Sequence, residues 1–133
     1  MAFMIHSVDD GRVLPIEYIP CGAITPKVGM ALVQTAGNAA IATGTTAPTY
    51  ISMIEKETAC VAGEMIPVVR VQKDVIYETE NSASFSSVKV GTKVTLATDG
   101  LRVTATATDG VAEVVDFDEV AAAGQGGKVR VRF

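Results

Sequence analysis

Few side chains in this sequence could carry catalysis. The chain has one histidine, His6, and two cysteines, Cys21 and Cys60. No third residue is marked to orient a Cys/His nucleophile pair, so we interpret His6 as a surface or interface residue. The two cysteines stand far apart in sequence and lack metal-ligand spacing. We therefore expect reduced core thiols rather than a disulfide or a metal site.

The acidic residues also favour structure over chemistry. Asp116, Asp118 and Glu119 lie close together, but they lack the glycine-punctuated spacing of a calcium loop, and we interpret them as a solvated turn. Asp99 and Asp109 could be imagined as the carboxylate pair of a glycoside hydrolase. Each precedes a glycine, however, which a turn explains fully. The sequence predicts no catalytic residue, no metal and no cofactor, and hence a protein that is not an enzyme.

Residues 91–117 are predicted to form a three-stranded antiparallel meander. Asp99-Gly100 and Asp109-Gly110 separate three runs of alternating apolar and polar residues, and Asp-Gly favours the two-residue type I′ turn. The third strand should end or bulge near Val115, because continued pairing would place Asp116 on the core face. Counting outward from the turns pairs Leu96 with Val103, Thr95 with Thr104, Ala105 with Val114, and Thr106 with Glu113.

The rest of the chain predicts further short strands. Residues 65–72 are apolar on both faces and should form a central strand, with 75–79 returning beside it. Residues 49–57 could begin a helix, but Pro48 lies too close and favours a strand. Together these elements predict an all-β fold, a small β-barrel or β-sandwich. The other elements expected are strands at 30–35, 39–43 and 128–133, a turn at 36–38 and one helical turn at 119–123.

The first 20 residues are predicted to form an N-terminal arm, followed by a single β domain at 21–133. Two apolar stretches, 3–8 and 13–19, flank a turn at 9–11. Pro15 and Pro20 disfavour a central strand, because proline cannot donate to a ladder, so an arm or an edge hairpin is expected. The candidate contact residues of this arm are Phe3, Met4, Ile5, Val13, Leu14 and Ile16.

Composition narrows the classes of partner. The net charge is −4 and no dense cluster of Lys or Arg occurs, which argues against direct nucleic-acid binding. Apolar residues are scattered in short runs, so no membrane span is expected. The first residues lack the basic region of a signal peptide. Only 20% of the residues are charged, which indicates interfaces with other chains.

Three segments, at 24–33, 44–51 and 63–68, together resemble small tailed-phage capsid proteins of the decoration, or head-stabilising, type, and residues 111–133 resemble structural proteins of prophage head-gene clusters. The resemblance implies a β-tulip-like domain on the virion, outside the capsid, commonly trimeric. Such a protein clamps the major capsid protein with its N-terminal arm. It would be made in the host cytoplasm without a signal peptide.

Other classes stay open beside this resemblance. The chain is longer than the smallest decoration proteins, which leaves a tail or neck component as an alternative. A carbohydrate- or host-surface-binding β module would be expected to expose aromatic residues, yet the chain has three Tyr, four Phe and no Trp. An enzyme of another type would reveal itself through perturbed carboxylates in a pocket.

Overall fold

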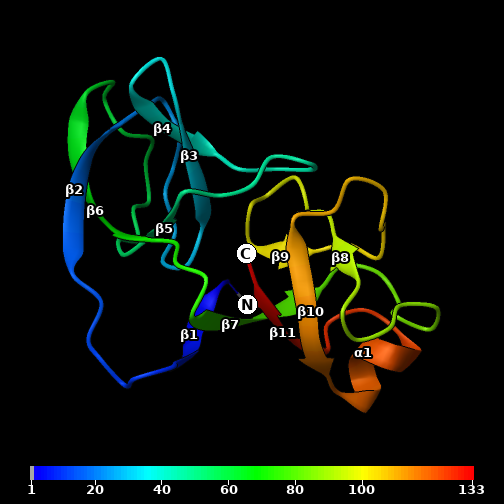
Figure 1. Ribbon diagram of the computed structural model, residues 1–133. Helices are drawn as coiled ribbons and strands as arrows, with labels where there is room; N and C mark the ends of the chain where they lie inside the picture. Colours follow the sequence, from blue (N-terminus) through cyan, green and yellow to red (C-terminus); the bar gives the residue numbers. More distant parts are fainter. Residues whose placement is uncertain (1) are drawn as a thin grey trace.

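The computed structural model describes residues 2–133, and nearly all of its regular structure is β (Figure 1). This confirms the predicted all-β class. The elements are β1 (Met4–Val8), β2 (Ile16–Cys21), β3 (Ala31–Thr35), β4 (Asn38–Ile41), β5 (Tyr50–Ser52), β6 (Glu64–Arg70), β7 (Val75–Asn81), β8 (Lys93–Val94), β9 (Arg102–Val103), β10 (Ala112–Phe117), α1 (Glu119–Ala123) and β11 (Lys128–Arg132).

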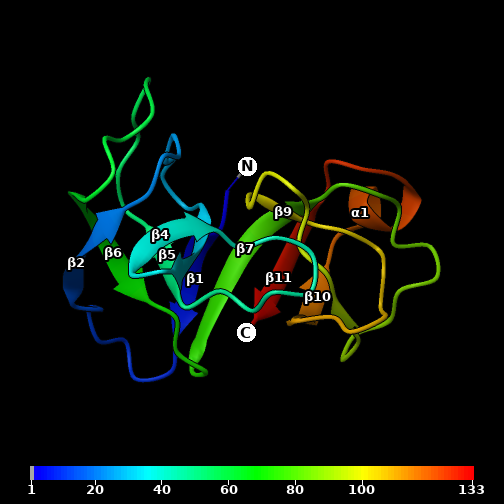
Figure 2. The same cartoon turned by 90° about the horizontal axis from the view of Figure 1, so that it is seen from above.

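The strands form two sheets that lie side by side (Figures 1 and 2). Strands β2, β4, β3, β5 and β6 close into a barrel. The second sheet has the order β1-β7-β11-β10-β8, and β9 joins β7 in parallel. One hydrophobic core spans both, because Ile51 and Val69 of the barrel belong to the same cluster as Val75, Tyr77 and Val131 of the second sheet. The two sheets therefore share a buried interface.

The β3–β4 hairpin closes through a two-residue turn. Ala36 and Gly37 both have positive φ, 50° and 84°, as a type I′ turn requires, and Thr35 pairs with Asn38. The turn predicted at 36–38 is thus confirmed. The central position predicted for 65–72 is also confirmed, because β6 pairs with β2 on one side and β5 on the other.

The N-terminal residues do not form a detached arm. Strand β1 pairs with β7 in the second sheet, and β2 pairs along its whole length with β6 in the barrel. Prolines are tolerated here because Pro15 precedes the strand, and because β4, on the other side of β2, pairs with it at Cys21 only. A missing N–H at Pro20 therefore interrupts little of the ladder.

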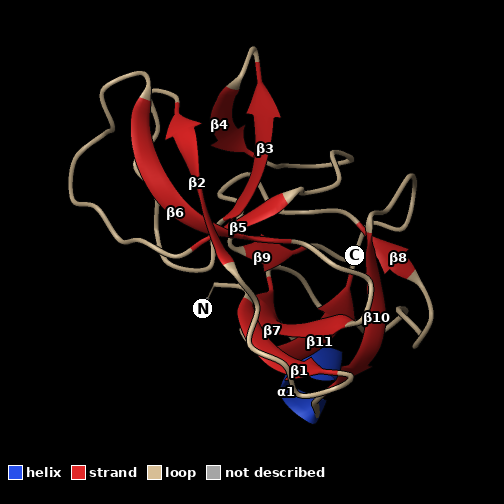
Figure 3. Cartoon of the chain, turned by 60° about the vertical axis from the view of Figure 1, so that its left-hand side comes forward, coloured by secondary structure: helices blue, strands red, loops and turns tan. Residues whose placement is uncertain are grey.

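The predicted return of 75–79 alongside 65–72 is wrong. The chain leaves β6 at the barrel and enters β7 in the second sheet, where β7 pairs with β1 and β11. Figure 3 shows this crossing between the two groups of strands. The turn composition of Lys73-Asp74 marked a change of direction but could not specify which sheet the next strand joins.

The predicted meander is correct for its first two strands only near their turn, and it is wrong for its third strand. Leu96 pairs with Val103, and the Thr95 and Thr104 hydroxyls lie 2.6 Å apart, as counted from the sequence. Strand β10 pairs instead with β8 and β11. The Thr106 carbonyl accepts from Thr95 N–H, so the second predicted strand is already paired with the first. Strand β11 also offers β10 a longer alternating partner. The pairs of Ala105 with Val114 and Thr106 with Glu113 are not formed.

The bulge predicted near Val115 is confirmed, although it occurs against β11. The register of β10 shifts between Val114 and Asp116. The shift takes Asp116 off the core face, and its carboxylate accepts from Arg130 Nη1 at 2.9 and 3.0 Å. An acidic residue in an apolar strand thus predicted the irregularity without predicting the partner strand.

The two Asp-Gly turns are not type I′. Only Gly100 has positive φ in the first turn (67°) and only Asp109 in the second (55°). In the first, the Asp99 carboxylate accepts from Leu101 N–H at 2.9 Å. The reason for the different geometry is tertiary: Ala31 N–H of the barrel donates to the Gly100 carbonyl at 2.8 Å, which docks the turn on the barrel.

We expect Gly100→Ala to lower the free energy of unfolding by about 2 kcal/mol, through left-handed strain together with a clash. A Cβ there would lie 2.6 Å from Ile41 Cγ2 and 3.2 Å from the Ala31 carbonyl oxygen. Gly44→Ala is the matched control, with φ 60° and no atom within 4 Å of the added Cβ. It should cost only about 1 kcal/mol. Equal costs in urea unfolding would contradict the docking of the turn.

The C-terminal region follows its local pattern. Asp118 caps α1, because its carboxylate accepts from Ala121 N–H at 2.9 Å, and the helix ends at Gly124 as predicted. Val129 and Val131 of β11 are fully buried while Lys128 and Arg132 are exposed, and the strand predicted at 128–133 is thus formed with one buried face. Within residues 2–133, no helix has the length and apolar character needed to span a membrane.

Candidate interaction surface

The residues considered for catalysis do not converge. His6 lies exposed on β1, with Nδ1 3.8 Å from Glu78 Oε2, while Cys21 and Cys60 belong to the core cluster inside the barrel. Asp99 pairs with Arg102 at its own turn. Within residues 2–133, no group of three or more His, Cys, Asp or Glu side chains is placed to hold a metal ion.

The most distinctive surface is an exposed group of large apolar side chains, which we call the apolar face: Met4, Ile5, Val13, Ile16 and Met53. Val13 is 93% exposed and Ile16 56%. The residues come from β1, the β1–β2 connection, the start of β2 and the position directly after β5. The connection loops out below the barrel in Figure 1. Segments far apart in sequence therefore build one surface.

Two shallow grooves make this surface continuous. A groove of about 170 Å³ is lined by Met4, Ile5 and Met53 together with the backbone around Gly29. A second, of about 310 Å³, is lined by Ile5, Val13, Ile16 and Met53. Ile5 and Met53 line both grooves, so the grooves are neighbours. The apolar face is uneven enough to receive protruding side chains of a partner.

The predicted contact residues divide into two groups. Met4, Ile5, Val13 and Ile16 are exposed in the apolar face. Phe3 and Leu14 are buried in the protein's own core, at 1% and 7% exposure. The Phe3 ring contacts Phe133 edge-on, with centroids 5.4 Å apart. Phe3 and Leu14 can thus form the floor of the surface, and the contact of the other four with a partner stays a prediction.

The sequence interpretation missed the part of the surface that β2, β5 and β6 contribute. Met53, Tyr18 and Met65 are exposed, the last two at 64% and 54%. Tyr18 lies opposite Pro67 and Pro20 opposite Met65, which extends exposed apolar area along the β2–β6 pair. The signal in the sequence for this exposed face of β2 was the alternation of Ile16 and Tyr18 with the buried Ile19 and Cys21. The assignment of residues 1–20 to an arm left this alternation unused.

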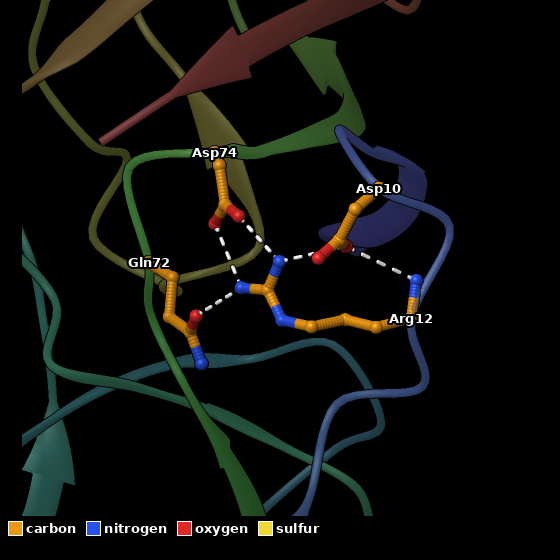
Figure 4. Close-up of polar contacts among 4 residues, drawn as sticks. All are labelled: Asp10, Arg12, Gln72 and Asp74. Atoms are coloured by element: carbon orange, nitrogen blue, oxygen red, sulfur yellow. Dashed lines mark hydrogen bonds and ion pairs between the residues drawn. The ribbon is translucent and has the colours of Figure 1, made fainter.

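An arginine fixes the connection that carries Val13 (Figure 4). The Arg12 guanidinium donates to both Asp74 oxygens, at 2.5 and 3.0 Å, to Asp10 Oδ1 at 2.9 Å, and to the Gln72 side-chain oxygen. The pKa values of Asp10 and Asp74 lie below the usual value because Arg12 donates hydrogen bonds to both carboxylates. The β1–β2 connection is therefore held against the β6–β7 connection, which positions Val13 and Leu14.

A close backbone contact fixes the other end of the surface. Phe3 N–H donates to the Gly29 carbonyl at 2.9 Å, and Gly29 N–H donates to the Ser52 carbonyl at 2.8 Å. Gly29 has φ of 82°, and a Cβ there would lie 2.7 Å from the Phe3 carbonyl oxygen. Glycine is thus required for β1 to approach β5, which brings Met4 beside Met53.

Beneath the surface, Tyr77 pairs with Ile5 across β1 and β7. Its hydroxyl is buried and has no hydrogen-bond partner among residues 2–133. Burial, with a smaller effect from Asp74, raises the pKa of Tyr77 to about 12. The ring contributes packing, with its centroid 5.6 Å from that of Phe133.

We expect Tyr77→Phe to keep the free energy of unfolding or raise it by about 1 kcal/mol, because it removes an unpaired buried hydroxyl and keeps the ring. Tyr50→Phe is the matched control, since the Tyr50 hydroxyl accepts from Arg70 Nη2 at 3.1 Å. The control should lower the melting temperature. A larger loss from Tyr77→Phe than from Tyr50→Phe would show that the Tyr77 hydroxyl has a stabilising partner.

Comparison of the chain with protein-family models, with curated proteins and with solved structures finds no match. The exposed apolar face and the three sequence segments are thus the features of this chain that bear on its function.

Proposed function

We propose that this protein is a non-enzymatic virion structural protein that binds the outer surface of a phage capsid lattice and stabilises it. The observation that carries the proposal is the apolar face, presented on a folded β body. The resemblance to decoration proteins supplies the partner, the major capsid protein.

The composition of the apolar face suits a protein partner. Large contiguous apolar surfaces are uncommon on monomeric proteins and are typical of binding sites, and the centres of interfaces are poor in charge. Two methionines, Met4 and Met53, give the face side chains that adapt to a partner's shape. Charged groups lie at its margin, where Arg70 pairs with Glu17 at 2.9 Å and Arg12 is held by its carboxylates. An apolar centre with a polar rim is the usual organisation of a protein interface.

We propose further that the protein acts as a homotrimer on the exterior of the virion. Three copies of the apolar face on one body raise the effective concentration of the second and third contacts once the first has formed. A weak single contact can then give stable attachment to a repeating lattice.

The direct experiment mixes the purified protein with capsids assembled without it. We expect the protein to sediment with the capsids in a saturable way and to raise the temperature at which they break open. Light scattering should give the mass of three chains. A monomer that leaves the capsids unbound and equally heat-sensitive would refute the proposal.

The apolar face is better tested by substitutions at exposed positions than by a deletion. Deleting residues 2–14 would remove β1 together with the buried Phe3 and Leu14, so a loss of binding could reflect unfolding. Substitutions at exposed positions such as Ile5 and Ile16 avoid this problem. They leave the core cluster intact and alter only the face.

A further inference from the structure

Cys21 and Cys60 meet inside the barrel although they are distant in sequence. Cys21 ends β2 and is 0% exposed, and Cys60, in the connection between β5 and β6, is 5% exposed. Both belong to one core cluster, with Ile19, Leu32 and Ile66 among its members. Both are free thiols. The spacing of two single cysteines gave no sign of this contact.

Backbone hydrogen bonds hold the two cysteine segments together. Cys60 N–H donates to the Ile24 carbonyl at 2.8 Å, and Gly63 N–H donates to the Cys21 carbonyl at 2.8 Å. The β5–β6 connection therefore lies along the end of β2 and the residues that follow it. These main-chain hydrogen bonds bring the two cysteines close together, so their proximity does not depend on side-chain rotamers alone.

The thiols are close enough to affect each other. The pKa of Cys21 is raised to about 12, first by burial and then by a hydrogen bond with the Cys60 thiol. The neighbouring Lys56 and Glu64 side chains form an ion pair, and their charges act on the Cys21 thiol in opposite directions. The two sulfur atoms thus share a largely apolar site with an ion pair beside it.

We propose that Cys21 and Cys60 form an intramolecular disulfide when the folded protein meets a small disulfide oxidant such as oxidised glutathione. One thiol loses its proton, and its sulfur attacks the glutathione disulfide, which releases one glutathione. The second cysteine sulfur then attacks the mixed disulfide and releases another glutathione. Two protein thiols are oxidised, one glutathione disulfide is reduced, and the two thiol protons pass to the two glutathiones.

Burial makes this reaction slow and its product durable. A thiol with a raised pKa supplies little thiolate, so oxidation requires opening of the β5–β6 connection. The bond would tie that connection to β2 and restrict the unfolded chain, which raises stability. The moment at which the disulfide forms rests on the proposed function, because a protein carried on a released particle passes from a reducing cytoplasm to oxidising surroundings.

The test uses the wild-type protein alone, without capsids, so its outcome is independent of the proposed function. The protein is incubated with oxidised glutathione, unfolded with an alkylating reagent present, and weighed by mass spectrometry. We expect the loss of two hydrogen atoms, no alkylation, and a Cys21–Cys60 linked peptide after digestion. The melting temperature should rise and return to its first value after dithiothreitol.

Cys21→Ala and Cys60→Ala are the matched variants, and each should show one alkylated or glutathionylated cysteine and no rise in melting temperature. The wild-type peptide map needs neither variant to fold. Two alkylated cysteines after prolonged oxidation, stable glutathione adducts on both cysteines, or linkage only between chains would overturn the proposal.

Discussion

Asn81→Ala is expected to lower the free energy of unfolding by about 3–5 kcal/mol, the size of effect seen when a buried polar network loses its centre. Asn81 ends β7 and is 0% exposed. Its amide joins three backbone carbonyls, one of them within α1, and one backbone N–H near the end of α1. Nδ2 donates to Ala83 (2.8 Å), Ala121 (3.0 Å) and Gly124 (2.7 Å), and Oδ1 accepts from Gly127 N–H (2.9 Å).

The large effect follows from what remains after truncation. Alanine leaves a cavity, leaves the buried Gly127 N–H without its partner at a cost of about 1–3 kcal/mol, and removes the three bonds to backbone carbonyls. Ser84→Ala is the matched control in the same loop, because its hydroxyl makes only two longer bonds: it donates to the Ala122 carbonyl at 3.3 Å and accepts from Ser86 N–H at 3.2 Å. It should cost less than about 1 kcal/mol. Similar midpoints for the two variants in urea would contradict a central role for Asn81.

Ile5→Glu combined with Ile16→Glu is expected to reduce capsid affinity at least about 100-fold, because two carboxylates would be buried unpaired at the interface. Both side chains are exposed, 41% and 56%, so the folded structure should tolerate the change. Cosedimentation over a range of protein concentrations measures the affinity. Circular dichroism and the melting temperature confirm folding.

Val90→Glu combined with Val120→Glu is the matched control, with the same chemistry at residues 64% and 58% exposed. Neither residue lines the grooves of the apolar face. Val120 belongs to α1, which lies at the end of the molecule away from the barrel (Figures 1 and 3). This control should bind capsids as the wild type does. Equal loss in the two double variants would contradict the assignment of the apolar face.

The sequence predicted the features that depend on local pattern. Alternation sufficed for β11, the helical turn at α1 was marked by the glycine that follows it, and the Leu96–Val103 pair followed from counting across one turn. It could not predict which strands meet across long separations. Strand β10 pairs with β8 and β11, because pairing depends on the whole arrangement of buried faces and not on the adjacent turn.

The candidate surface was predictable only in part for the same reason. The apolar residues of 1–20 were visible, but burial of Phe3 and Leu14 depends on Gly29 and on the Arg12 network. Met53 joins the surface only because β1 lies beside the end of β5. The contact between Cys21 and Cys60 likewise requires the closed barrel.

The most direct test of the account is hydrogen–deuterium exchange of the protein, free and bound to capsids. We predict slower exchange on binding for peptides that cover 4–8, 13–18 and 53, which carry the apolar face, and unchanged exchange for 86–92 and 119–123. Binding that protects only the latter segments, or that leaves 4–8 and 13–18 unchanged, would contradict attachment through the apolar face.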